Sequence, residues 1–208
     1  AQSDIAFGAF TMQGSVDEMT TAYVMVQGMR GGMPIFLEPN VEEYVVIIGQ
    51  EASITGGGEA QKLNSRFMAV HAEAGKKQQE LGQQFKTAQD AGDEKTMLEI
   101  QNRFQEMSRE VQAKEDELIK ESPDSPVSVF YVSNGMRNMD YESLKARFDL
   151  LGYLAKESPE GKVLADHLQK MESVSIGKVA PDFTLETPDG GTISLHAVPG
   201  KVKLIDFW

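Results

Sequence analysis

The sequence predicts an α+β protein in which a β-rich section, a helical section and a second β-rich section follow one another. Three observations support this prediction. Short apolar runs between Gly and Pro turns fill residues 5–56, Gln, Glu and Lys dominate residues 60–121 without a proline, and a two-residue period returns from Ser175. We therefore expect three domains, over residues 1–58, 59–175 and 176–208.

Five runs rich in strand-forming residues predict short β-strands in the first section, at residues 9–14, 20–27, 33–37, 43–48 and 52–55. Turn residues, such as Pro39 and Asn40, separate them. The run 43–48 is apolar on both faces, which is typical of an interior strand. This spacing predicts a meander that forms one antiparallel sheet of a β-sandwich. The glycines at 56–58 lack the Gly-Lys-Ser/Thr ending of a phosphate loop, so they predict a loop before a helix.

The helical section predicts a long antiparallel hairpin over residues 63–88 and 94–121. The second helix has an apolar seam with heptad steps of three and four, at Met97, Ile100, Phe104, Met107, Val111 and Leu118. Gly92 can end the first helix and Asp93 can cap the second. Each helix would be on the order of 40 Å long. Glu110 and Lys114 have the favourable spacing for an ion pair along one helix.

Three shorter helices are predicted between residues 122 and 175. Ser125 with Pro126, and Ser158 with Pro159, are N-cap and first-turn pairs, and Asp140 can cap a helix that runs to Leu151. Gly135 and Gly152 have the positions of residues that end a helix.

The last section predicts a β-hairpin followed by a buried strand. Residues 183–185 and 192–195 flank the turn sequence Pro188-Asp189-Gly190-Gly191, and the apolar run 202–207 follows.

Composition excludes several functions. The net charge of −12 and the isoelectric point near 4.7 disfavour nucleic acid and anionic membrane surfaces, because both require clustered Lys and Arg. No apolar run is long enough for a membrane-spanning helix. Without cysteine, these residues contain no disulfide, thiolate metal site or cysteine nucleophile. His71, His167 and His196 lack partners at metal-ligand spacing, so we expect neither a metal nor a cofactor.

The C-terminal motifs resemble a known family. Val179-Ala180-Pro181-Asp182-Phe183, the Pro-Asp-Gly-Gly turn and Leu204-Ile205-Asp206-Phe207-Trp208 are similar to the start of the TlpA/ResA-like thiol-disulfide oxidoreductases of the thioredoxin superfamily. The resemblance covers residues 177–208. Peroxiredoxins share the Ala-Pro-Asp-Phe opening, but the Asp-Phe-Trp ending favours the thioredoxin branch. The resemblance to the TlpA/ResA-like family implies that residues 176–208 form the first strands of a thioredoxin-like fold. It also implies that a Cys-x-x-Cys follows Trp208 in the complete protein.

Asp206 is the one candidate catalytic residue. It matches the aspartate that thioredoxins bury behind their cysteine pair, so the resemblance implies a proton acceptor for the resolving thiol. The alternative is an incidental match, because many TlpA-like proteins have another residue there.

The N-terminal section also resembles a known domain. Residues 14–39, Ile54-Thr55-Gly56 and Asn64-Ser65-Arg66-Phe67 are similar to the uncharacterised β-domain that precedes thioredoxin domains in Bacteroidetes proteins. In that family further strands come first, often preceded by a lipid-anchored cysteine, so we expect this sequence to enter the domain partway, and a lipid anchor upstream is left open. The resemblance implies a periplasmic or outer-membrane-anchored location in the cell envelope.

These observations lead to one functional expectation and two alternatives. We expect the non-catalytic N-terminal part of a thiol-disulfide oxidoreductase, whose partners are protein thiol or disulfide substrates or a redox partner protein, with a homodimer left open. The alternatives are a binding or structural module with a cysteine-less thioredoxin-like domain, and a peroxiredoxin-like antioxidant enzyme.

Overall fold

A computed structural model describes residues 2–29, 31–49 and 52–206 and confirms the α+β class. Strands and helices follow one another in three sections. The first holds β1 (Thr20–Val24), β2 (Met33–Leu37), β3 (Tyr44–Ile47) and β4 (Ser53–Gly56). The helices are α1 (Glu59–Ala91), α2 (Glu94–Glu121), α3 (Pro126–Gly135), α4 (Tyr141–Leu150), α5 (Tyr153–Glu157) and α6 (Pro159–Ser173), with short 3-10 turns at Met136–Asn138 and Leu195–Ala197. The last section holds β5 (Thr184–Glu186) and β6 (Thr192–Ser194).

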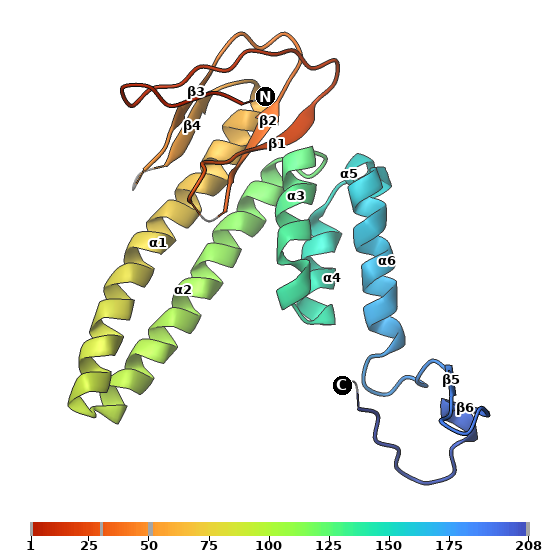
Figure 1. Ribbon diagram of the computed structural model, residues 1–208. Helices are drawn as coiled ribbons and strands as arrows, with labels where there is room; N and C mark the ends of the chain where they lie inside the picture. The colour runs from red at the N-terminus through yellow and green to blue at the C-terminus, as the bar shows by residue number, and fades with distance from the viewer. Residues whose placement is uncertain (1, 30, 50–51, 207–208) are drawn as a thin grey trace.

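The predicted helical hairpin is confirmed. Helices α1 and α2 run antiparallel and form one arm of the molecule (Figure 1). Gly92 ends α1 in the left-handed conformation, and the Asp93 carboxylate accepts a hydrogen bond from the Thr96 amide at 3.0 Å. The distal half of the arm buries Leu81, Ala88 and Ile100, with Phe85, Met97, Phe104 and Met107 packed against them.

Ion pairs on the arm lie both within one helix and between the two helices. Lys114 was predicted to pair with Glu110, but its Nζ lies 2.8 Å from Glu73 Oε2 on α1. Lys77 also binds Glu73, at 3.1 Å. These cations hold the pKa of Glu73 below its ordinary value, mainly through the hydrogen bond from Lys114. The intrahelical prediction was wrong because the facing helix offers a carboxylate that the sequence spacing does not reveal.

The four N-terminal strands do not form the single sheet that the sequence predicted. β1 pairs with β2, and β3 pairs with β4, as two separate antiparallel hairpins. β3 is therefore not interior, and its Val45 and Ile47 side chains are exposed. Residues 9–14 form no strand; Ala9 makes only an isolated bridge with Ala6. Both hairpins lie at the N-terminal end of α1 (Figure 1).

Helices α3 to α6 form the second arm beside α2. Ser125, Asp140 and Ser158 each cap the following helix, as predicted. The number of helices differs, because the extra short helix α5 stands between α4 and α6. Gly152 precedes α5 as its N-cap instead of ending α4, and Gly135 continues into a 3-10 turn with a right-handed backbone.

The main core lies where the two arms meet the β-hairpins. It combines Phe36 of β2 with apolar side chains of the helices α1 to α6, among them Phe67, Ile119, Val132, Leu144 and Leu164. Because β2 and both helical arms contribute side chains, the β1–β2 hairpin and the two arms share one core.

The C-terminal hairpin lies beyond α6, apart from the helical arms (Figure 1). β5 and β6 pair as predicted, around the turn at Asp189 and Gly190. Residues 202–206, by contrast, form no strand, and the rest of that predicted strand, Phe207, lies outside the described residues. A strand requires a neighbour for its backbone groups, and none pairs with this segment among the described residues. The thioredoxin-like fold of residues 176–208 stays a prediction.

Candidate functional site

The buried polar side chains of α1 bind the edges of two β-hairpins. Gln61 and Asn64 are fully buried in its first two turns. The Gln61 amide oxygen accepts a hydrogen bond from the Phe36 amide at 2.9 Å, and Asn64 Nδ2 donates to the Pro34 carbonyl at 2.8 Å. The next residue, Ser65, donates its hydroxyl hydrogen to the Ile54 carbonyl of β4 at 2.6 Å.

These contacts explain why the four strands do not merge. The bonded groups of β2 point away from β1, and the bonded group of β4 points away from β3. Side chains of α1 therefore occupy the edges that β2 and β4 would need in order to pair with another strand. Pro34 fits this arrangement because its missing N–H lies on the same outer side and removes no bond of the β1–β2 ladder.

Glu38 fills the anion-binding position at the start of α1. Its carboxylate accepts hydrogen bonds from the Ala60 and Gln61 amides, each at 3.3 Å. A helix N-terminus favours negative charge, and a side chain of this chain supplies it. Gly57 and Gly58 form the predicted loop before α1, whereas Gly56 is the last residue of β4.

Tyr131 connects this edge contact to the centre of the molecule. Its hydroxyl donates to Asn64 Oδ1 at 3.0 Å, and its ring stacks on Phe67 with centroids 3.9 Å apart. Burial raises the pKa of Tyr131 far above its ordinary value, and the nearby Glu115 charge adds to the effect. The phenol therefore stays protonated and serves as a hydrogen-bond donor.

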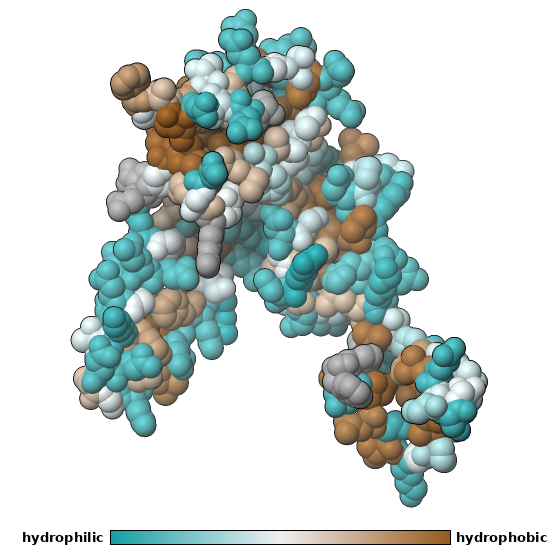
Figure 2. All heavy atoms as spheres, in the orientation of Figure 1, coloured by the Kyte–Doolittle hydropathy of each residue, from teal (hydrophilic) through white to brown (hydrophobic). Residues whose placement is uncertain are grey.

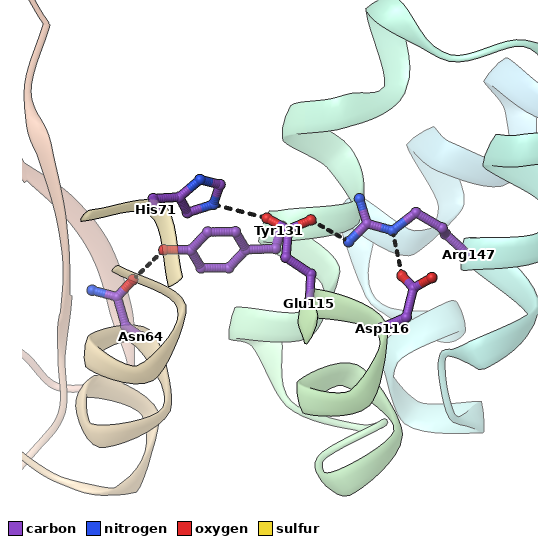
Figure 3. A network of polar contacts seen from close by, with 6 residues as sticks. All are labelled: Asn64, His71, Glu115, Asp116, Tyr131 and Arg147. Carbon is purple, nitrogen blue, oxygen red and sulfur yellow. Dashed lines mark hydrogen bonds and ion pairs between the residues drawn. The ribbon is translucent and has the colours of Figure 1, made fainter. Parts of the chain in front are cut away.

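An ion-pair network joins α1, α2 and α4 around Glu115 (Figure 3). Arg147 of α4 is only 2% exposed, and its guanidinium donates to Glu115 Oε2 at 2.8 Å and Asp116 Oδ1 at 2.9 Å. The other oxygen of Glu115 binds His71 Nε2 of α1 at 2.8 Å. Burial raises the pKa of Asp116 above its ordinary value, although Arg147 acts in the opposite direction.

This network holds the two arms together. Every buried side-chain nitrogen and oxygen has a hydrogen-bond partner in the part of the chain that the structure describes. The same residues contain no group of three His, Cys, Asp or Glu side chains that could hold a metal ion. Sequence reasoning missed the network, since neither the burial of Arg147 nor the partners of Glu115 follow from helical spacing.

Asp206, the predicted catalytic residue, lies in the exposed segment after β6 and takes no part in the network. The burial that the resemblance implies for it is not present among the described residues, so its proton-transfer role stays a prediction. No thiol accompanies it, because the chain has no cysteine.

Asp182 has a structural role that the sequence reasoning did not assign. Its carboxylate accepts hydrogen bonds from the His196 amide at 2.9 Å and the Ser194 hydroxyl at 3.0 Å. These bonds hold the pKa of Asp182 below its ordinary value, with the His196 amide as the largest cause. The aspartate of the Ala-Pro-Asp-Phe motif thus ties the segment before β5 to the end of β6.

No helix in the described part of the chain is both long and apolar enough to cross a membrane. No family model, no curated protein and no solved structure matches this chain.

Proposed function

We propose that this chain is the non-catalytic N-terminal part of a cell-envelope thiol-disulfide oxidoreductase. In the complete protein, residues 176–208 would begin a thioredoxin-like domain whose Cys-x-x-Cys follows Trp208. One cysteine thiolate would attack a substrate disulfide, and the second cysteine would resolve the mixed disulfide.

The apolar side chains of the C-terminal section support this proposal most directly. The β5–β6 hairpin forms with its turn and its Asp182 contacts in place, yet the side chains around it remain uncovered. Leu204 is 94% exposed, and the other exposed apolar residues are Ile176, Val179, Phe183, Leu185, Ile193, Val202 and Ile205. Such a density of exposed apolar residues is typical of a surface that packs against further structure. The sheet and helices of a thioredoxin-like domain would supply that cover.

The helical arms and N-terminal hairpins have the character of a scaffold. Their buried polar side chains have hydrogen-bond partners, and the described residues contain no group of three His, Cys, Asp or Glu side chains that could hold a metal ion. Under this proposal they position the redox domain and its protein substrates, while Asp206 becomes buried and accepts the proton of the resolving thiol.

The sequence of the whole gene provides the first test. We expect a Cys-x-x-Cys within about seven residues after Trp208. A chain that continues without cysteine would contradict the proposal and favour a binding module, whereas a single cysteine in a Thr/Ser-x-x-Cys setting would favour a peroxiredoxin.

The enzymatic test compares the full-length protein with this chain. The full-length protein should reduce insulin disulfides in the presence of a dithiol reductant, and replacing the first cysteine by serine should abolish the reaction. Residues 1–208 should show only the background rate, because a methionine thioether cannot exchange with a disulfide. Activity in this cysteine-free chain would show that the chemistry has been assigned wrongly.

A further inference from the structure

The outer edge of β3 offers unpaired backbone groups. The Gly57 amide donates to the Glu43 carbonyl at 3.0 Å, so residues 43 and 57 are a hydrogen-bonded pair of the β3–β4 ladder. The next hydrogen-bonded pairs are 45 with 55 and 47 with 53. Tyr44 and Val46 fall between these pairs, and their N–H and C=O groups point away from β4.

The opposite edge of the same hairpin confirms this alternation. Ile54 is the partner of Val46, and its carbonyl points away from β3 to accept the Ser65 hydroxyl. The edge of β4 is thus occupied by α1. No described residue forms a corresponding backbone hydrogen bond with the outward groups of Val46.

The surface beside this edge is apolar and is bordered by negative charge. Val45 and Ile47 are 45% and 53% exposed, and hydrophobic surface is visible over the β-hairpin end of the molecule (Figure 2). Glu42 and Glu43 are exposed immediately before β3, and neither forms an ion pair with the described residues. The edge of β3 therefore offers an incoming strand three kinds of contact: backbone hydrogen-bond donors and acceptors, an apolar face, and carboxylates.

We propose that the outer edge of β3 binds an extended polypeptide segment that carries alternating apolar residues and flanking Lys or Arg. The segment would add as a third strand to the β3–β4 sheet, with its backbone bonded to Tyr44 and Val46. Its apolar side chains would lie beside Val45 and Ile47, and its cations would lie near Glu42 and Glu43. If the chain belongs to a thiol-disulfide oxidoreductase, such a segment fits an unfolded region of a protein substrate.

Charge favours a basic segment over a second copy of this chain. Two copies would each bring a net charge of −12, and pairing of two such short strands would bury little surface against that repulsion. The outer edge of β1 is a weaker candidate, because its exposed residues include the polar Thr20 and Thr21, and the ring of its exposed Tyr23 already contacts Phe130.

Fluorescence anisotropy with a labelled peptide, Lys-Lys-Val-Thr-Val-Thr-Val-Lys-Lys, tests the proposal. We expect saturable binding to residues 1–208 that weakens with added salt. Val46→Pro should weaken it by about tenfold or more, because proline removes the outward N–H but none of the β3–β4 bonds. Thr21→Pro is the matched control: its N–H also points outward, on the other hairpin, and the affinity should not change.

A second pair of variants covers the case in which Val46→Pro disturbs folding, as circular dichroism would show. Glu42→Lys combined with Glu43→Lys should weaken binding and reduce its salt dependence, whereas Glu80→Lys on α1 should affect binding less.

Absence of binding at about 1 mM peptide would overturn the proposal. Equal affinity of the Val46→Pro and wild-type chains, in a folded variant, would also overturn it. Dimerisation of the wild type that Val46→Pro abolishes would assign the edge to a second copy instead. None of these outcomes depends on thiol chemistry, so the redox proposal can fail while this one stands.

Discussion

Replacing Arg147 by methionine should destabilise the protein strongly at pH 7. Methionine keeps much of the length of the side chain but removes two hydrogen bonds, of 2.8 Å to Glu115 and 2.9 Å to Asp116. The Glu115 side chain is only 9% exposed, so its charge would lose its main partner away from water. Removing one member of a buried ion pair costs about 3–5 kcal/mol. For a chain of this size, the melting temperature should fall by about 6–20 °C.

Urea unfolding followed by circular dichroism at 222 nm measures this loss, and two variants interpret it. Arg103→Met removes an exposed arginine that binds Gln84 on the distal arm, and it should cost no more than about 0.5 kcal/mol. Adding Glu115→Gln and Asp116→Asn to Arg147→Met should restore part of the stability, because no uncompensated charge then remains.

The pH dependence has a definite sign. Arg147 lowers the pKa of Asp116 in the wild type, so its removal raises that pKa further. An acid with a raised pKa in the folded state is stabilised by protonation, and the variant should regain stability as the pH falls. A loss below about 1 kcal/mol at pH 7 would refute the view that this network joins the two arms.

Three further predictions concern other parts of the molecule. Phe104→Pro should cost roughly 3 kcal/mol or more and reduce the helical signal, because it breaks α2 within the seam of the arm; a fully helical variant would contradict this. Trypsin should cut first after Lys178, in the exposed segment between α6 and β5, and leave a helical fragment; a first cut within α1 or α2 would contradict it. Hydrogen bonds from Thr96 and Ser143 lower the pKa values of Asp93 and Asp140 below the ordinary value of 3.8. The contribution of these two carboxylates to folding stability is therefore present above that pH and is lost on acidification. Replacing both by asparagine should flatten the acid side of the stability profile, and an unchanged profile would show that these caps contribute nothing measurable.

Local signals predicted the helical part well. Capping residues such as Ser125 and Asp140 bind amides two or three positions further on, so their role is visible in the sequence alone. The heptad seam likewise identifies one face of a helix, and that face packs as expected against α1.

Contacts between segments that lie far apart in the sequence could not be predicted from these local signals. Asn64 was recognised only as part of a sequence motif, yet it binds the edge of β2, 30 residues earlier. Glutamine and asparagine near a helix start are usually solvated, so nothing in the pattern separates these buried ones from the exposed ones. The same limit applies to Arg147, whose burial depends on the carboxylates of another helix.

The bond between the Phe36 amide and Gln61 links two elements of different kinds. In most sheets, an amide exchanges its hydrogen with solvent when the neighbouring strand separates. Here the acceptor belongs to α1, so the Phe36 amide becomes accessible only when the first turns of that helix move away or unwind. The strand and the helix should therefore open as one cooperative unit, and the exchange rate of one amide in β2 would report the local unfolding of α1.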